Sequence, residues 1–450
     1  MPLLTFRQPP LAHLFIALTW IGFVQAHAAP VTQRGGAMPP PAGPVQNDTA
    51  QDREHRAGVQ AQLRGDLASA RRRFEAALKL SPDHVPALLG MADLAQRQKQ
   101  REQTEKWLGQ AERVAPGSAL VQLARGRFHM AGHDLARAES AFLAARAAAP
   151  MAIAPLVELG DLHLQQPGRA PEALKDYRAA QALDKSNATV SYGLGVALLA
   201  NGQRSEATVA LNRAAELAPR DPAPARALGR MYLEAGEPGQ AVAAFDAGLK
   251  RQPNWIPLLL DRTDALARQG RWDDAIKQVK RVLELQPRVA EVQFKAADVY
   301  QGASLWPQAR ASYLKSIELD PGNPLSYNNL AWMTVTRGDD AASAVSWASK
   351  AVELSPESSP FHDTLGWAHR AAGRLDLAQA SLYRAIELEP RIAGYHYHLG
   401  IVQTELNQLG KARAALARAL EIDTKFAQAD DARRRLQALP VAPQDAFHPR

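Results

Sequence analysis

The 450-residue chain contains no cysteine. It therefore forms no disulfide, offers no thiolate to a metal, has no cysteine nucleophile and carries no lipid on an N-terminal cysteine. Aromatic residues make up only 6% of the sequence, while Ala and Leu recur throughout it. Because sheets favour aromatic and β-branched side chains, this composition predicts an all-α protein of closely packed helices.

Common catalytic motifs are also missing. The sequence has neither a GxxxxGK[ST] phosphate loop nor a GxSxG elbow, and its Ser, His and Asp residues show no triad-like placement. The net charge of +7 is modest for this length, and basic residues are scattered apart from short clusters such as 71-RRR-73. We therefore expect no enzyme, no cofactor, no metal and no nucleic-acid partner.

The N-terminus has the pattern of a secretory signal. Arg7 is followed by an apolar stretch from Leu11 to Val24 and by the small residues 26-AHA-28. This predicts a signal peptide over 1–28 and a periplasmic or secreted protein, with an uncleaved anchor as the alternative. Membrane contact is then expected only through that segment or through a partner. Residues 29–50 are rich in Pro and Gly and predict a disordered linker.

Three kinds of position recur along the chain, mostly every 34 residues. Prolines occupy one of them: Pro82, Pro116, Pro150, Pro219, Pro253, Pro287, Pro321, Pro356 and Pro390. Twelve residues earlier stands a small residue, usually alanine, as at Ala70, Ala138, Ala207, Ala241 and Ala378. Another small residue lies in the first half of each repeat, as at Gly58, Gly126, Gly160, Gly195, Gly229, Gly366 and Gly400. This period indicates a repeat protein.

Each repeat is expected to form two helices joined by a short turn such as 200-ANGQ-203. Glycine inside a helix costs about 1 kcal/mol relative to alanine, so its repeated use implies a close approach of two helix backbones. Large residues such as Phe74, Tyr177 and Phe245 are expected to fill the adjoining space. The proline ends the second helix because it cannot donate the helical hydrogen bond.

These positions together resemble the tetratricopeptide repeat, as in 191-SYGLGVALLANGQRSEATVALNRAAELAP-219. The resemblance covers eleven repeats over residues 51–426 and implies a right-handed superhelical solenoid of helix-turn-helix units. The fourth and ninth repeats each contain one extra residue, which we place in the turn between the two helices. Residues 427–439 predict a capping helix, and residues 440–450 predict a disordered tail.

The resemblance also implies that the first helix of each repeat lines a concave groove. The groove residues are then the fifth, ninth and twelfth of each repeat, which helical geometry places on one stripe. In the third to seventh repeats this stripe mixes apolar and charged residues, including Arg127 and Asp161. In the last three repeats it carries exposed aromatic, amide and charged side chains that are candidates for partner binding: Asn328, Asn329, Trp332, Asp363, Thr364, Trp367, Arg370, Tyr397 and His398.

Two histidines, His362 and His369, lie seven residues apart in 361-FHDTLGWAHRAAGR-374. Their repeat positions face neighbouring helices, which predicts that they pack rather than react. A metal site would need a third ligand, for which His396 or His398 is the nearest candidate. A metal-dependent hydrolase therefore stays open as an alternative.

The expected function is a non-catalytic scaffold that holds partners in its groove. The motifs 329-NLAW-332 and 363-DTLGW-367 resemble repeats of Gram-negative envelope proteins in exopolysaccharide secretion and exosortase-associated systems. That resemblance implies other envelope proteins as partners. The aromatic, amide and charged groove residues suit an extended peptide, and the basic balance of an exported protein suits an anionic polysaccharide. A periplasmic chaperone or assembly adaptor for extended polypeptides is the alternative non-catalytic role.

Overall fold

The computed structural model describes residues 49–440 of the chain. In that range the chain consists of helices joined by turns and contains no strand, so the predicted all-α fold is confirmed there. None of the helices in it has the length and apolarity needed to cross a membrane. The predicted signal peptide at 1–28, nearly all of the linker and the tail from residue 441 lie outside the described residues.

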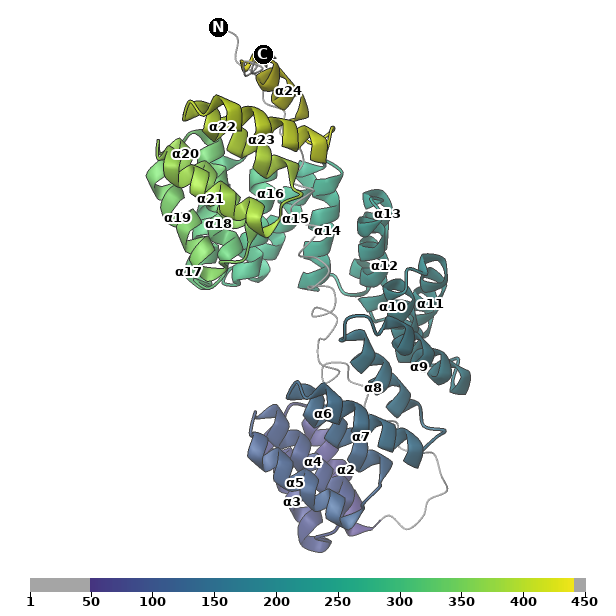
Figure 1. Cartoon of the computed structure of the whole chain (residues 1–450). Helices are drawn as coiled ribbons and strands as arrows, with labels where there is room; N and C mark the ends of the chain where they lie inside the picture. The colour runs from purple at the N-terminus through teal and green to yellow at the C-terminus, as the bar shows by residue number, and fades with distance from the viewer. Residues whose placement is uncertain (1–48, 441–450) are drawn as a thin grey trace, which may run out of the picture. The chain divides into compact units, whose positions relative to one another are not determined.

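The helices fall into two compact units that divide at residue 253 (Figure 1). The N-terminal unit, residues 49–253, consists of six consecutive helix pairs. In chain order its helices are α2 (Ala50–Leu63), α3 (Leu67–Leu80), α4 (Val85–Arg97), α5 (Arg101–Val114), α6 (Ala119–Ala131), α7 (Leu135–Ala148), α8 (Ile153–Leu164), α9 (Ala170–Leu183), α10 (Ala188–Ala200), α11 (Arg204–Leu217), α12 (Ala223–Glu234) and α13 (Pro238–Arg251).

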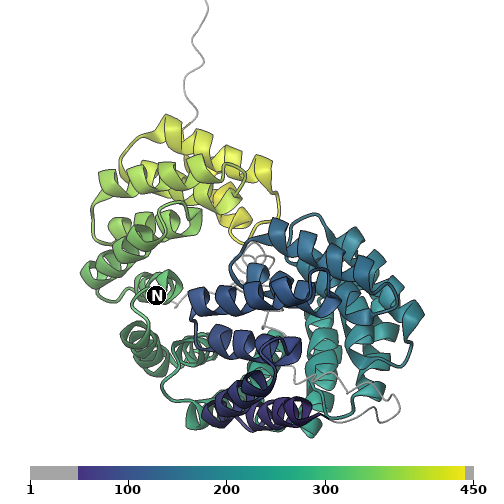
Figure 2. The ribbon, with the colours of Figure 1, turned by 90° about the horizontal axis from the view of Figure 1, so that it is seen from below.

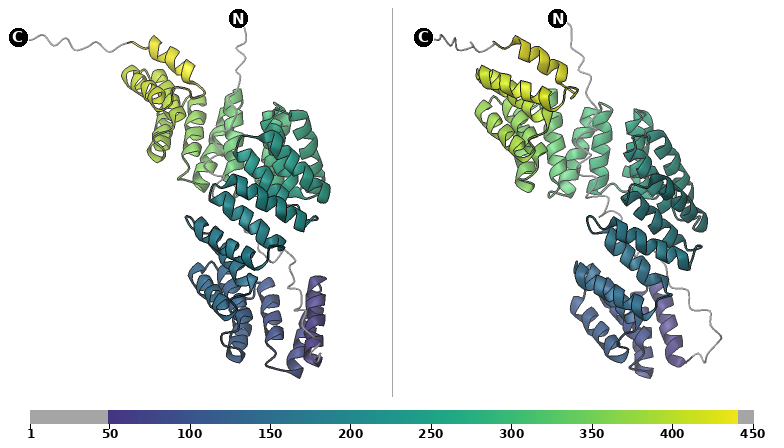
Figure 3. Two further views of the ribbon diagram at one scale, coloured as in Figure 1. Left: turned by 90° about the vertical axis from the view of Figure 1, so that its right-hand side faces the viewer. Right: turned by 45° about the vertical axis from the view of Figure 1, so that its right-hand side comes forward.

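The C-terminal unit, residues 254–440, consists of five further pairs and a last single helix (Figures 2 and 3). Its helices are α14 (Ile256–Arg268), α15 (Trp272–Leu285), α16 (Ala290–Gly302), α17 (Trp306–Leu319), α18 (Pro324–Arg337), α19 (Ala341–Leu354), α20 (Ser359–Ala371), α21 (Leu375–Leu388), α22 (Ala393–Glu405), α23 (Leu409–Ile422) and α24 (Ala429–Ala438). Within each unit, every pair packs against the next, which gives a solenoid.

A recurring proline follows the second helix in nine of the eleven pairs. All nine stand two residues beyond the last residue of a second helix, as Pro82 follows α3 and Pro390 follows α21. The prediction that proline ends this helix is therefore confirmed. In the two repeats without the proline the second helix ends at the same place. The N–H of Asp184 bonds the carbonyl of Ala180 after α9, and the N–H of Asp423 bonds that of Ala419 after α23.

The turn inside each pair needs one residue with a left-handed backbone. Glycine supplies it in repeats such as the fifth, where Gly202 has φ 73°, but Lys99, His133, Ser304 and Asn407 adopt the same conformation elsewhere. In the fourth repeat the extra residue does lie in the turn, between α8 and α9. In the ninth repeat the extra residue also lies in the turn: α19 begins three residues after the left-handed Gly338, whereas α21 begins two residues after the equivalent Gly373.

The small residues of the first helices lie against large side chains of the second helices. A Cβ atom added at Gly160 would lie 2.5 Å from Tyr177, one at Gly366 would lie 2.7 Å from Leu382, and one at Gly229 would overlap the ring of Phe245. Such contacts are too short for real atoms. The predicted steric demand for glycine at this position is therefore confirmed, and the rings fill the space that glycine leaves.

Helix α24 covers the end of the C-terminal unit. Its residue Ala432 and the following Leu439 are buried in one cluster with Leu416 of α23. The Arg413 guanidinium donates to the backbone carbonyls of Leu436 and Leu439, at 3.1 and 3.2 Å, and so ties α23 to the C-terminal end of α24.

Candidate functional site

The candidate partner-binding residues lie on α18, α20 and α22, the first helices of the last three pairs. Four of them form what we call the inner column: Trp332, Trp367, Arg370 and His398. The ring of His398 stacks on Trp367 with centroids 4.3 Å apart, and it lies 6.1 Å from Trp332. The Arg370 guanidinium lies 4.4 Å from the centre of the Trp367 ring. The structure thus brings together side chains from three helices. The two that are farthest apart in the sequence, Trp332 and His398, are separated by 66 residues.

Charged partners hold the column in place. A carboxylate oxygen of Asp363 lies 2.7 Å from Nδ1 of His398, and both residues are buried. Arg370 donates from Nε to both carboxylate oxygens of Glu405 at 2.9 and 3.1 Å. The rings of Trp367 and His398 and the Arg370 guanidinium are therefore held by contacts within α20 and between α20 and α22.

The expectation that the whole candidate set is exposed is wrong for five residues. Asn328, Asp363, Thr364, Tyr397 and His398 are buried, whereas Asn329, Trp332, Trp367 and Arg370 keep part of their surface accessible. The reason is that neighbouring first helices pack closely enough to cover side chains near their line of contact. The Tyr397 hydroxyl, for example, donates to Asp431 of α24 at 2.7 Å.

A polar chain runs beside the column on α16 and α18. Asn328 Nδ2 donates to Asn329 Oδ1 at 3.2 Å, and Asn329 Nδ2 donates to Asp298 Oδ1 at 3.3 Å. The Tyr313 hydroxyl also donates to Asp298, at 2.6 Å. Burial raises the pKa of Asp298 despite the neighbouring Lys295 ammonium. The Asn328 amide thus donates to Asn329, which in turn donates to the carboxylate, and Asn328 Oδ1 is left buried without a hydrogen-bond partner.

The two histidines of the 361–374 segment, His362 and His369, are half-buried. His362 Nε2 donates to the carbonyl of Pro356 at 2.8 Å, and His396 makes the same bond to Pro390 at 2.9 Å. Burial lowers the pKa of His369. Over residues 49–440 no group of three or more His, Cys, Asp or Glu side chains could hold a metal ion. The hydrogen bond of His362 to the backbone and the partial burial of His369 are those expected of packing residues.

We call the surface formed by the first helices of a unit its inner face. The inner face of the N-terminal unit differs in chemistry from the inner column of the C-terminal unit. Arg127 on α6 pairs with Glu158 on α8, with Nη2 and Oε1 2.6 Å apart, and the carboxylate is almost fully buried. The Tyr177 hydroxyl donates to Asp161 at 2.5 Å. The predicted stripe positions Arg127 and Asp161 are thus found in contacts between neighbouring helices.

Sequence reasoning missed a buried charged cluster in this unit. His163 on α8 lies between Asp176 of α9, at 2.8 Å, and Glu139 of α7, at 3.3 Å. Arg169 donates to both oxygens of Glu139 at 2.8 and 3.0 Å. Burial alone would lower the pKa of His163, but the two carboxylates outweigh it and the pKa is raised. No spacing signal relates these positions, because each lies on a different helix.

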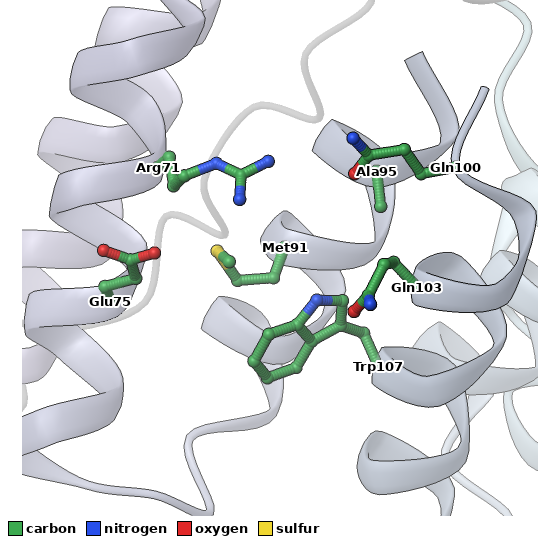
Figure 4. A pocket seen from close by; sticks show the side chains of 7 residues that line it. All are labelled: Arg71, Glu75, Met91, Ala95, Gln100, Gln103 and Trp107. Atoms are coloured by element: carbon green, nitrogen blue, oxygen red, sulfur yellow. The ribbon is translucent and has the colours of Figure 1, made fainter. Parts of the chain in front are cut away.

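Sequence reasoning also missed a groove between α3 and α5 on the N-terminal unit. It consists of two cavities that share Trp107, of about 350 and 730 Å³. Figure 4 shows the smaller one, with Trp107 and Met91 at its base and Arg71, Glu75 and Gln103 around it. We call both cavities together the outer groove.

Three family models, each described as a tetratricopeptide repeat, match the chain. They cover residues 61–128, 164–231, 260–324, 312–340 and 364–430, which is more than half of the sequence. The chain is also similar to cellulose synthase operon protein C of Pseudomonas fluorescens (strain SBW25), with 28% identity over 223 residues. That match spans 47% of this chain and 17% of the length of the relative.

Several solved structures are similar to the chain at low identity. The Cut9–Hcn1 hetero-tetramer of APC/C has 14% identity and a TM-score of 0.46, over 86% of this chain and 97% of that one. Yeast Tom70 has 13% identity and a TM-score of 0.45, and the match covers 87% of this chain and 96% of Tom70. MamA has 24% identity and a TM-score of 0.34, over 38% of this chain and 94% of that one.

Proposed function

Because the chain belongs to the tetratricopeptide repeat family, a scaffold for protein–protein interaction, we propose that it is a non-catalytic scaffold of the cell envelope that binds its partner at the inner column. The partner is another envelope protein, bound through an extended segment. The observation that carries this proposal is the column itself. Trp332, Trp367 and Arg370 keep accessible surface, and His398 and Glu405 hold Trp367 and Arg370 in place.

Partly exposed Trp and Arg side chains are the residue types that dominate binding energy at protein interfaces. The contacts of Arg370 with Glu405 and of Trp367 with His398 reduce the conformational entropy that these side chains would lose on binding. Beside them, Asn329 keeps part of its surface accessible and can offer its amide to a peptide backbone. This combination suits an extended polypeptide better than a small molecule.

The cellular setting of the proposal is the periplasm or the exterior, with a role in exopolysaccharide or biofilm-matrix secretion. It is supported by the signal-like sequence of 1–28 and by similarity to a protein named for a cellulose synthase operon. A reporter enzyme that works only after export, fused behind residues 1–48, tests the location. Activity of this fusion is expected, and its absence would remove the periplasmic part of the proposal.

The binding proposal is tested by the double variant Trp332→Ala and Trp367→Ala in the full chain. The bait is purified from envelopes of the source cell, and bound proteins are identified by mass spectrometry. We expect recovery of the partner to fall by about tenfold or more, since interface hot spots exceed about 2 kcal/mol each. The matched control is Trp347→Ala on α19, a half-buried indole on a second helix.

Helicity of each variant is compared by circular dichroism. Unchanged helicity with lost binding supports the column as the site. Equal loss in the Trp347→Ala control, or full retention in the double variant, would refute it. Recovery of many unrelated unfolded proteins in place of one envelope component would instead favour the chaperone alternative.

A further inference from the structure

The loops that join one helix pair to the next lie along one edge of the N-terminal unit. The two helices of a pair are joined by a short turn and run antiparallel, so each connection to the following pair returns to the same edge. The first two of these loops lie side by side, because Pro82 in one and Val114 beside the other line the same cavity. We call residues 79–84, 113–120 and 146–152 the loop edge.

Large apolar side chains protrude from the loop edge. Four of them are exposed to solvent: Leu80, Val114, Leu120 and Met151. The most exposed is Met151 in the third loop, at 79%. Elsewhere between residues 49 and 152, only Leu63 and Leu143 are large apolar residues with comparable exposure. Single exposed apolar residues are common on proteins, but four along one edge indicate a surface that contacts an apolar partner.

Basic side chains accompany these apolar ones. Lys79 and Arg113 each directly precede one of them, at the end of a second helix, and neither forms an ion pair with any residue of 49–440. Arg146, which lies 3.7 Å from the carboxylate of Asp176, adds a third cation. Asp83 is the only carboxylate within the three segments. The loop edge therefore combines exposed apolar groups with an excess of positive charge.

The equivalent positions of the C-terminal unit carry the opposite charge. The last residue but one of the second helix, which is Lys79 in α3 and Arg113 in α5, is glutamate in all five second helices of that unit. Four of these glutamates pair with a Lys or Arg three residues earlier, as Glu318 does with Lys315. The repeat thus requires no basic residue at this position, and the unpaired cations are particular to the loop edge.

An anionic membrane surface is the partner that fits this chemistry. Proteins bind such a surface when apolar side chains enter the head-group region and cations lie beside the lipid phosphates. A bilayer needs no complementary shape, so side chains that are spread over three successive loops can all reach it. A soluble polyanion would pair with the cations but would leave Leu120 and Met151 exposed.

The chain also enters the N-terminal unit at this edge. Helix α2 begins at Ala50, and Oδ1 of Asp52 in its first turn lies 3.1 Å from Nε2 of His84 in the first loop. The part of the chain that precedes α2 therefore joins the unit at the loop edge. Any attachment of that part to a membrane would bring the loop edge toward the same surface.

We propose that the loop edge binds the surface of a membrane that contains anionic phospholipids. Its four exposed apolar side chains enter the head-group region, and Lys79 and Arg113 lie beside lipid phosphates. This contact is additional to the one expected through residues 1–28 or through a partner. It uses a surface separate from the inner column and does not depend on the proposed function.

The absence of cysteine from the chain allows a position-specific test in the full chain. Met151→Cys carries an environment-sensitive fluorophore on the loop edge. The matched control carries it at Val209→Cys on α11, a position of the same unit that is 71% exposed. Each labelled chain is mixed with vesicles of phosphatidylcholine, alone or with an equal part of phosphatidylglycerol. Because a label reports its own surroundings, lipid binding by other segments does not produce its signal.

With the phosphatidylglycerol vesicles, we expect a blue-shifted and stronger emission from the loop-edge label and no change from the control label. Adding Lys79→Glu and Arg113→Glu should reduce the change about tenfold or more, because each cation near an anionic surface contributes to binding. The charge-matched control is Lys277→Glu with Lys280→Glu, two exposed lysines on α15 of the C-terminal unit, and it should leave the signal unaffected. All these positions are exposed, so each variant should keep its helicity in circular dichroism.

No response from the loop-edge label, or an equal response from both labels, would overturn the proposal. An equal loss in the charge-matched control would attribute the binding to overall charge and would overturn it as well. An equal response to phosphatidylcholine alone would contradict the role of the cations. The same response to dextran sulfate in place of vesicles would assign the loop edge to a soluble polyanion.

Discussion

In the N-terminal unit, the inner face joins neighbouring first helices by ion pairs such as Arg127 with Glu158. In the C-terminal unit, ion pairs such as Arg370 with Glu405 also join first helices, but the same face adds the inner column of rings, Trp332, Trp367 and His398. The two units nevertheless pack their helix pairs in the same way, with a small residue of the first helix against a large residue of the second. The repeat therefore determines the packing and leaves the inner face free to differ.

The largest expected effect concerns the packing that both units share. Gly229→Val in the N-terminal unit and Gly366→Val in the C-terminal unit should each destabilise the unit concerned by about 3 kcal/mol, because the side chain would overlap Phe245 or Leu382. Hydrogen–deuterium exchange with mass spectrometry measures the loss in each unit separately. A marked loss in one unit and none in the other would show that the packing is not equivalent.

The next-largest effect distinguishes the inner face of the N-terminal unit from that of the C-terminal unit. Arg127→Leu leaves the buried Glu158 carboxylate, 2% exposed, without its cation and should cost about 2 kcal/mol. Arg370→Leu should cost less than about 1 kcal/mol, because Glu405 is exposed to solvent. Thermal denaturation followed by circular dichroism compares the two. Equal losses would contradict the difference in burial between the two acceptors.

The smallest effect is a pH dependence confined to the N-terminal unit. The folded pKa of His163 lies above its unfolded value of about 6.5, so protonation stabilises the fold. This contribution is complete below the unfolded pKa and is lost as the pH rises through the folded pKa.

Protection of the N-terminal unit, measured by hydrogen exchange corrected for intrinsic rates, should therefore decrease between about pH 6 and pH 8. The variant His163→Gln should remove this decrease. A decrease that persists in the variant would show that another group is responsible.

The sequence was sufficient to predict the helix pairs, because the signals that specify them are local or periodic. Proline at Pro82 and its equivalents ends a helix by its own covalent structure, and glycine at Gly229 marks a close approach at a fixed spacing. The extra residue of the ninth repeat was placed correctly for the same reason, because the spacing up to Gly338 is unchanged and only the segment from Gly338 to α19 is longer.

The candidate site was predicted less completely. Helical spacing correctly grouped Trp332, Trp367 and Arg370, but it did not show that Asp363 and His398 bond each other and are buried. Burial depends on how closely successive pairs pack, which no single repeat encodes. For the same reason the cluster around His163 and the outer groove around Trp107 could not be foreseen, since their side chains come from three helices.

The central claim, that the inner column of the C-terminal unit is the partner-binding surface, is tested most directly by photo-crosslinking in the source cell. A photoreactive phenylalanine analogue replaces Trp332 on the inner face or, as the control, the exposed Tyr383 on α21. We expect one discrete crosslinked envelope protein from position 332 and none from position 383. Crosslinks from position 383 alone, or the same product from both positions, would contradict the claim.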